Sequence, residues 1–328
     1  MSTYYQIFGG KVNAVSADPS DPVKGQVWFN TTSAAMKYQS ATTAGAWASG
    51  GNLANARTNL AGAGTQTSSL AFCGSPGDGS VSNSTEEYDG SSWTSGGNLP
   101  TAKRNMGGSG TQTAALGSCG STTGDPGSPS TSSEEYDGTS WTSGGSTSTA
   151  RRGGVQAGTQ TSAVTFGGAA PSGDTAATEE YDGTSWTAGG SLPSVNAFMG
   201  GAGTQTAALS FGGGTPGTST FEYDGTSWTA GGSMVTGQSD NQGAGLQTAA
   251  INMGGEKSPR ASTQTYNGTS WSTETSMSTG RSTSAPSTAG TTASALVAGG
   301  NTGTPPFSTL TEEFTGGPTA VTKTITAS

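Results

Sequence analysis

Short apolar stretches alternate with runs of Gly, Ser, Thr, Asp and Pro along nearly the whole chain. Between residues 199 and 231, for example, the apolar run "AALSFGG" and the alternating run "STFEYD" are each bounded by turn-forming residues. Runs of this length and pattern predict β-strands. Helical periodicity is absent, and Gly and the β-branched Thr suit helices poorly. The pattern therefore predicts an all-β protein.

The same short motifs return along the chain with one period. The tetrapeptide "GTQT" begins at Gly64, Gly110, Gly158 and Gly203, and weaker versions begin at Gly245 and Gly290. Two aromatic series have the same spacing of about 45 residues, which is typical of β-propeller repeats. They are Trp47, Trp93, Trp141, Trp186, Trp228 and Trp271, and Tyr88, Tyr136, Tyr181, Tyr223, Tyr266 and Phe314.

Each unit reads as four strands. "GTQT" separates the first two strands, and "DGTS" is the hairpin turn between the third and the fourth. The Asp of that turn is expected to cap it at Asp89, Asp137, Asp182 and Asp224. The sixth unit has a third strand at Phe314 but no Trp strand after it, whereas Trp47 has no unit before it. Pairing these two strands predicts six four-stranded blades, closed by an amino-terminal strand. In the alternative, "PTAVTKTITAS" supplies the last strand.

The repeat resembles the Kelch repeat over residues 46–316. The resemblance rests on the double Gly after the second strand ("FGG" at 166–168 and 211–213), the Tyr-Asp pair and the Trp of the fourth strand. It implies a closed propeller and says little about activity. Each Trp is expected to pack between blades. The basic residues Arg57, Arg104 and Arg151 occupy equivalent positions and are expected to form ion pairs between blades.

The amino-terminal segment, residues 1–45, lies outside the repeat, and residues 317–328 form a carboxyl-terminal tail or an extra strand. "GQVWFNTTSAAMKYQS" predicts a β-hairpin and resembles a module of bacteriophage tail fibres through Gly25, Val27, Trp28, Phe29, Asn30, Thr31, Thr32, Lys37 and Tyr38. The whole chain resembles structural proteins of marine phages, including those that infect cyanobacteria. The resemblance implies a virion protein assembled in the host cytoplasm. Residues 1–45 would bind other virion proteins or another copy of this chain, giving a homo-oligomer.

Strand direction separates the repeated residues from the variable ones. Successive strands alternate in direction, so "GTQT" and "DGTS" lie at one end of every blade, here named the constant-turn face. The second-to-third loops and the blade-to-blade loops lie at the other end, the variable-loop face. Both chain ends should leave the propeller at the constant-turn face. Variable loops of repeat proteins often form the binding face.

The candidate recognition loops are therefore 75–84, 121–132, 169–177, 214–219, 256–262 and 301–308. The polar candidates within them are Asp78, Ser82, Asn83, Asp125, Ser128, Ser130, Ser172, Asp174, Thr215, Thr218, Lys257, Arg260, Asn301 and Thr304.

Composition and charge narrow the function. Only 30% of residues are hydrophobic and 56 are Gly, but seven Trp argue against a disordered stalk. The net charge of −9 argues against nucleic acid as a partner. No apolar run is long enough for membrane insertion. The chain has no His, the commonest general base and transition-metal ligand.

Catalysis is not expected. Paired carboxylates such as Glu86 and Glu87 could indicate glycoside hydrolysis, but adjacent residues of a strand point to opposite faces. "DGTSW" resembles the Asp box of sialidases, which is itself a structural turn. No cofactor or metal is expected. The favoured hypothesis is a virion adhesin that binds a host surface glycan or protein; the alternative is a capsid decoration or a tail or neck component without a ligand.

Overall fold

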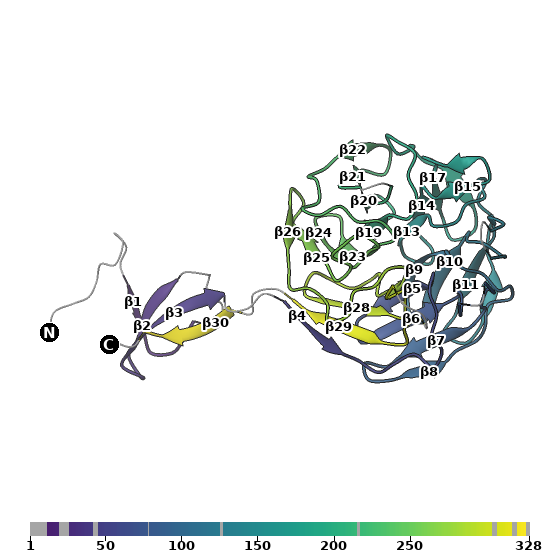
Figure 1. Ribbon diagram of the computed structural model, residues 1–328. Coiled ribbons are helices and arrows are strands. Elements are labelled where there is room, and N and C mark those ends of the chain that lie inside the picture. The colour runs from purple at the N-terminus through teal and green to yellow at the C-terminus, as the bar shows by residue number, and fades with distance from the viewer. Residues whose placement is uncertain are drawn as a thin grey trace. The chain divides into compact units, whose positions relative to one another are not determined.

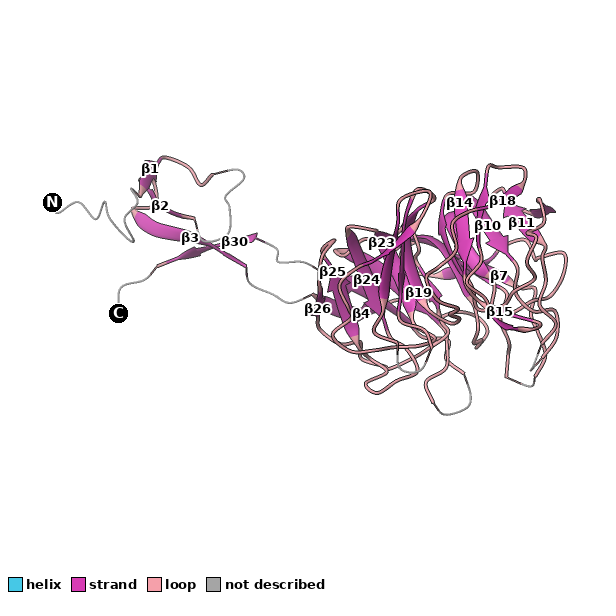
Figure 2. Cartoon of the chain, turned by 90° about the horizontal axis from the view of Figure 1, so that it is seen from above, coloured by secondary structure: helices cyan, strands magenta, loops and turns pink. Residues whose placement is uncertain are grey.

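The computed structural model describes residues 12–19, 26–41, 45–77, 79–124, 127–214, 217–303, 307–316 and 320–325. The chain divides into two compact units, one of residues 1–45 and 316–328 and one of residues 46–315. The described part contains strands and no helix, so the prediction of an all-β protein is confirmed (Figure 2). Its many four-stranded antiparallel sheets are consistent with a β-propeller.

In the larger unit, six four-stranded antiparallel sheets lie around a common centre (Figure 1). Sheet 1 contains β5 (Ala61–Thr65), β6 (Ser68–Phe72), β7 (Thr85–Tyr88) and β8 (Trp93–Ser95). Sheet 2 contains β9 (Gly107–Thr111), β10 (Ala114–Ser118), β11 (Ser133–Tyr136) and β12 (Trp141–Ser143). Sheet 3 contains β13 (Val155–Gly158), β14 (Ala163–Phe166), β17 (Thr178–Tyr181) and β18 (Trp186–Ala188).

The chain continues through three further sheets. Sheet 4 contains β19 (Gly200–Thr204), β20 (Ala207–Phe211), β21 (Thr220–Tyr223) and β22 (Trp228–Ala230). Sheet 5 contains β23 (Gln242–Leu246), β24 (Ala249–Met253), β25 (Thr263–Tyr266) and β26 (Trp271–Thr273). Sheet 6 contains β27 (Ala285–Pro286), β28 (Ser294–Ala298), β29 (Thr311–Thr315) and β4 (Ala46–Ser49). A short hairpin of β15 (Ala169–Ala170) and β16 (Gly173–Asp174) lies in the loop before β17.

Sheet 6 joins strands from opposite ends of the chain. β4 pairs with β29, and Trp47 lies opposite Phe314, as the repeat pattern predicts. Ala46 is the register partner of Thr315, so this unit begins and ends at the constant-turn face. The alternative, in which the carboxyl-terminal segment completes this sheet, is wrong, because β30 (Ala320–Thr324) pairs with β3 of the smaller unit.

The smaller unit is a four-stranded sheet in the order β1 (Asn13–Val15), β2 (Val27–Asn30), β3 (Ala35–Ala41), β30. The predicted hairpin is present as β2 and β3. Its motif residues converge on Asp18, whose carboxylate accepts hydrogen bonds from Trp28 Nε1 (3.0 Å), Asn30 Nδ2 (2.7 Å) and Lys37 Nζ (2.8 Å). These donors lower the pKa of Asp18 to about 2. The motif thus builds a polar cluster on a residue that the sequence pattern did not single out.

Successive sheets of the larger unit are joined by the repeated residues. The Trp of each fourth strand donates its indole N–H to a hydroxyl on the third strand of the preceding sheet, at 2.8–3.1 Å. The six pairs are Trp93–Thr311, Trp141–Thr85, Trp186–Ser133, Trp228–Thr178, Trp271–Thr220 and Trp47–Thr263. The first pair joins sheet 1 to sheet 6, so the contacts run through all six sheets and return to the first.

Two further repeated side chains act at five of these junctions. The Gln of "GTQT" donates to two backbone carbonyls of the preceding sheet, as Gln112 does to Ser69 (3.0 Å) and Tyr88 (2.7 Å). The Tyr of the third strand donates its hydroxyl to a Glu of the preceding sheet. The five pairs are Tyr88–Glu313, Tyr136–Glu87, Tyr181–Glu135, Tyr223–Glu180 and Tyr266–Glu222. Burial and the adjacent carboxylate raise the pKa of each Tyr to about 12.

The junction between sheets 5 and 6 differs in all three residue types at once. Phe314 stands in the Tyr position, Thr265 in the Glu position and Thr292 in the Gln position. The Glu is thus absent at the one junction where the Tyr hydroxyl is absent. A carboxylate there would be partly buried without its donor, which costs free energy.

At the centre, the first strands approach each other too closely for side chains. A Cβ on Gly108 would lie 2.4 Å from the Gly62 carbonyl oxygen, and one on Gly243 would lie 2.2 Å from that of Gly201. This close approach, together with the turns, explains part of the high Gly content.

Arg57 and Arg151 do not form the expected ion pairs between sheets. The basic residues instead pair within their own sheet, from the segment before the first strand to the third strand. The four buried pairs are Arg57–Glu86, Lys103–Glu134, Arg151–Glu179 and Arg281–Glu312, at 2.5–2.7 Å. Lys103, not Arg104, is therefore the equivalent of Arg57, and Arg281 was missed. The two adjacent Glu of a third strand therefore have separate roles. The first pairs with the basic residue of its own sheet, and the second accepts the Tyr hydroxyl of the next sheet.

The Tyr–Glu contact is testable with the residues that the chain itself uses between sheets 5 and 6. Tyr136→Phe and Glu87→Thr should each lower the free energy of unfolding by about 1–3 kcal/mol, because each breaks a charge-assisted hydrogen bond. The double variant should lose at least about 1 kcal/mol less than the sum, because it no longer leaves an unpaired carboxylate. Urea unfolding of the four proteins measures this coupling. Strictly additive losses would show that the pair does not act as a unit.

Candidate functional site

The two ends of the sheets differ in how their residues are used. At the constant-turn face, the Asp89 carboxylate accepts hydrogen bonds from the backbone N–H groups of Ser91 and Ser92, both at 2.8 Å. These bonds lower the pKa of Asp89 to about 2. Asp137, Asp182, Asp224 and Asn267 hold their turns in the same way. The repeated polar groups of this face are committed to the scaffold.

At the variable-loop face, one residue per sheet forms a ring of backbone contacts around the centre. Each ring residue has a positive φ between 52° and 60°, and the ring runs through Asn59, Asn105, Gly153, Phe198, Asp240 and Thr283. Each backbone N–H from Asn105 onward donates to the carbonyl of the ring residue before it, at 2.6–3.0 Å. The Leu60 N–H donates to the Thr283 carbonyl at 3.3 Å and so connects sheet 1 with sheet 6.

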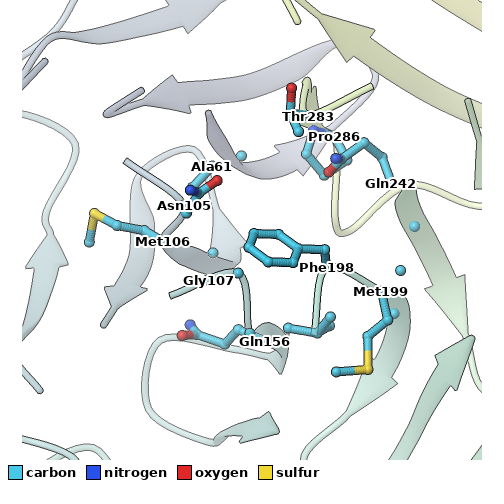
Figure 3. Close-up of a pocket in the computed structure, with 18 of the residues that line it drawn as sticks. Ala61, Asn105, Met106, Gly107, Gln156, Phe198, Met199, Gln242, Thr283 and Pro286 are labelled. Atoms are coloured by element: carbon cyan, nitrogen blue, oxygen red, sulfur yellow. The ribbon is translucent and has the colours of Figure 1, made fainter. Parts of the chain in front are cut away.

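Below this ring lies a small central cavity of about 90 Å³. The side chain of Phe198 occupies its middle, between Asn105 and Gln242 (Figure 3). The ring of Phe198 packs against Gly153, where a Cβ would lie 2.4 Å from Cε1, and the guanidinium of Arg152 lies 5.5 Å from the ring centroid. The side chain therefore narrows the central cavity, leaving space for a few small molecules such as water.

Above the ring lies a larger pocket of about 390 Å³, here named the mouth pocket. This volume is in the range of small-ligand sites. Loops of sheets 1, 5 and 6 line it, together with Arg104 from the segment before sheet 2. Its lining residues are Thr58, Asn59, Ser75, Gly77, Gly79, Arg104, Asp240, Glu256, Ser282, Thr283, Asn301 and Phe307. Three ring residues, Asn59, Asp240 and Thr283, line both this pocket and the central cavity.

Most charged groups of the mouth pocket are engaged. Glu256 accepts hydrogen bonds from Arg260 and from Ser282 Oγ (2.8 Å). The carboxylate of Asp240 differs, because no described residue donates a hydrogen bond to it. Burial and the charge of nearby Glu256 raise the pKa of Asp240 to about 6. The pocket thus contains a partly desolvated carboxylate with unused acceptor capacity.

The sequence-predicted candidates fall into three groups. Asp78, Asp125, Thr215 and Thr304 lie outside the described residues. Ser82, Asn83, Ser128 and Ser130 take part in hydrogen bonds of the loops: Asn83 Nδ2, for example, donates to the Leu99 carbonyl (3.2 Å). Ser172, Asp174 and Thr218 are exposed, away from the mouth pocket.

The remaining candidates lie at or beside the mouth pocket. Asn301 lines the pocket, and Arg260 donates to its carbonyl at 3.3 Å. The Lys257 backbone N–H donates to Gln238 Oε1 at 3.2 Å. Sequence reasoning missed Asn59 and Asp240, because they precede the first strand and lie outside the second-to-third loops. The available signal was Gly153, which occupies the same position in its repeat as Asn59 and Asp240. A Gly at that position indicates a backbone with positive φ.

No protein-family model matches the chain, and no curated protein matches its sequence. Among solved structures, the chain is similar to that of YjhT, with a TM-score of 0.64 over 79% of this chain and 95% of that chain. The two sequences are 14% identical. This likeness concerns the fold, and it supports a β-propeller-like architecture for the larger unit.

Two further features of the described residues bear on the site. No group of three or more His, Cys, Asp or Glu among them is placed to hold a metal ion. In the same part of the chain, no helix has the length and apolar character needed to cross a bilayer.

The raised pKa of Asp240 gives a stability prediction. In the unfolded chain this carboxyl ionises near pH 4, and in the folded chain near pH 6, so folding favours its protonated form. Its contribution to stability is thus fully present below pH 4 and is lost as the pH rises through 6. Asp240→Asn should therefore be more stable than the native chain by about 2–3 kcal/mol at pH 7.5.

The difference between the two proteins should disappear at pH 3.5, where both side chains are neutral. Asn suits the backbone here, because Asn59 and Asn105 occupy equivalent ring positions with the same sign of φ. Urea unfolding of both proteins at the two pH values measures the effect. A stability difference that does not change with pH would contradict the claim that burial disfavours the ionised Asp240 carboxylate.

Proposed function

We propose that this chain is a recognition protein of a bacteriophage virion, of the tail-fibre or adhesin type, which binds a host surface glycan or protein without catalysis. The larger unit would be a closed, six-bladed, Kelch-like propeller, and the smaller unit would attach it to other virion proteins. The observation that carries the proposal is the division between the two faces. Repeated side chains are used in the scaffold, whereas the variable-loop face contains a pocket with an unused carboxylate.

Three sets of contacts support the closed propeller. The Trp series joins every sheet to the one before it, including sheet 1 to sheet 6. The ring of backbone hydrogen bonds passes through all six sheets. Strand β4 completes sheet 6 beside β29, so the two ends of the unit are held in one sheet. Together they support six blades without a disulfide, since both cysteines are free and buried.

The virion part of the proposal rests on the amino-terminal motif and on the position of the chain ends. Trp28, Asn30 and Lys37 of the phage-like motif fold around Asp18 in a unit of their own. The larger unit begins at Ala46 and ends at Thr315, both at its constant-turn face. An attached propeller would thus be held from that face, leaving the variable loops available to a ligand.

The rival function is a capsid decoration, or a tail or neck component, that binds no ligand. It would use the same closed ring, so the fold does not separate the two. Immuno-electron microscopy of the particle separates them: label at fibre tips supports adhesion, and a lattice of label over the capsid supports decoration.

Binding to host cells tests the proposal with two matched variants of the full chain. The first places Lys at Ser172, Thr218 and Phe307 on the variable-loop face. The second places Lys at the exposed Thr139, Thr184 and Thr226 of the constant turns. Both change the charge by +3, so they share any non-specific effect. We expect the native protein and the second variant to bind cells equally, and the first variant to bind at least tenfold more weakly.

Fluorescently labelled proteins and a panel of marine bacteria, including a strain infected by the phage that carries this protein, provide the measurement. Circular dichroism first shows that each variant is folded. Absence of native binding to every strain would overturn adhesion in favour of the decoration function. Loss of binding in the second variant alone would show that the constant-turn face, and not the variable-loop face, binds the host, which contradicts the proposal.

A further inference from the structure

The mouth pocket contains two polar side chains that the scaffold does not use. Neither the carboxylate of Asp240 nor the side-chain amide of Asn59 forms a hydrogen bond with any described residue. Both are partly buried ring residues that line the pocket, and Thr283 occupies the ring position between them. Thr283 is itself engaged, because its hydroxyl lies 2.5 Å from that of Thr58. The Asp240 carboxylate of sheet 5 and the Asn59 amide of sheet 1 therefore both line the mouth pocket.

The two carboxylates of the pocket differ in how they are used. Both oxygens of Glu256 are engaged, by Arg260 and by Ser282, so Glu256 is held in place rather than available. Burial of Asp240 and the charge of Glu256 raise the pKa of Asp240 and make its ionised form costly, and the charges of Arg260 and Lys257 offset this only in part. A ligand that donates hydrogen bonds to Asp240 would offset this cost.

The rest of the lining is suited to a neutral, hydroxylated ligand. Ser75, Ser282 and Asn301 supply neutral polar groups, and Phe307 supplies one aromatic surface. The ring of Phe307 packs over Gly77, where a Cβ would lie 3.0 Å from Cε2, so a loop of sheet 1 supports a side chain of sheet 6. Arg104 and Glu256 complete the polar lining. A single aromatic surface among polar groups, with one unused carboxylate acceptor and one amide, complements the apolar face and the hydroxyl edge of a sugar ring.

We propose that the mouth pocket binds one sugar residue of a cell-surface glycan, with adjacent hydroxyls donating to the Asp240 carboxylate and bonding to the Asn59 amide, and with its apolar face against Phe307. This inference rests on the proposed adhesion and assigns it a ligand class and a position. Weak binding at one such pocket would be strengthened on a particle that carries many copies.

The ring offers a matched control within the same chain. Asn105 has the same backbone conformation as Asn59, with φ of 55° in both, but it lines only the central cavity. Gly153 shows that Gly is accepted at this ring position. Asn59→Gly and Asn105→Gly therefore remove the same side chain without backbone strain, and only the first alters the mouth pocket. Asp240→Asn keeps the shape of the acceptor and removes its charge.

The experiment measures binding of the labelled full chain and these three variants to cells of a strain that binds the native protein. Cells are used untreated, after periodate oxidation, which cleaves sugars between adjacent hydroxyls, and after protease treatment. We expect periodate to abolish binding and protease to leave it unchanged. Asn59→Gly and Asp240→Asn should each bind at least tenfold more weakly than the native chain, and Asn105→Gly should bind within twofold of it.

The possible failures are distinguishable. Binding that survives periodate but is lost after protease identifies a protein ligand, which overturns the sugar inference and leaves adhesion intact. Binding that is sensitive to periodate but unchanged in both pocket variants overturns the mouth pocket as the site. Equal losses in Asn59→Gly and Asn105→Gly would show a general effect of the ring and would also overturn it. Absence of native binding to all untreated strains overturns the adhesion proposal as well.

Discussion

The contact between one sheet and the next is the constraint on which the rest of the larger unit depends. A chain with 30% hydrophobic residues cannot form one large core. Its buried apolar residues are instead shared between neighbouring sheets, as where Phe72 of sheet 1 packs on Trp141 of sheet 2 with ring centroids 4.8 Å apart. The indole, Gln and Tyr hydrogen bonds lie around these small clusters. These hydrogen bonds fix the orientation of each sheet on its neighbour, which the small apolar contact area alone would not specify.

This constraint explains why the same dozen residues recur. Each repeated side chain has a partner in the adjacent sheet, so a change on one side requires a change on the other. The junction between sheets 5 and 6 shows the rule, because Tyr, Glu and Gln are replaced there together by Phe314, Thr265 and Thr292. The variable loops carry none of these three repeated side chains, and they differ from sheet to sheet. The separation of scaffold from candidate recognition surface thus follows from where the junction residues lie.

Much of the fold could be read from the sequence, because its signals are local and repeated. The period of Trp47 and its equivalents predicted the strands, and the unmatched strands at Trp47 and Phe314 predicted their pairing. The partners of charged residues could not be read in this way. Arg57 was assigned to a neighbouring sheet, whereas a side chain of that length also reaches the third strand of its own sheet. Asp18 has no repeated equivalent, and only the folded hairpin shows its role.

The candidate site was predicted only in part for a related reason. Strand direction predicted the face at which the mouth pocket lies, and the predicted candidate Asn301 lines that pocket. Asn59 and Asp240 were missed because their position depends on a backbone conformation and on the closeness of sheets 1, 5 and 6, neither of which has a strong local pattern. The sequence also did not indicate that polar residues of the loops, such as Asn83, form hydrogen bonds within the unit.

The central claim is that the repeated residues form a scaffold and that recognition belongs to the opposite face. Hydrogen–deuterium exchange of the full chain, with and without surface polysaccharide from a strain that binds it, tests this most directly. The account predicts slower exchange in residues 75–77, 256–262 and 301–303 and no change in the "DGTS" turns. Protection confined to those turns, with the loops unchanged, would contradict it.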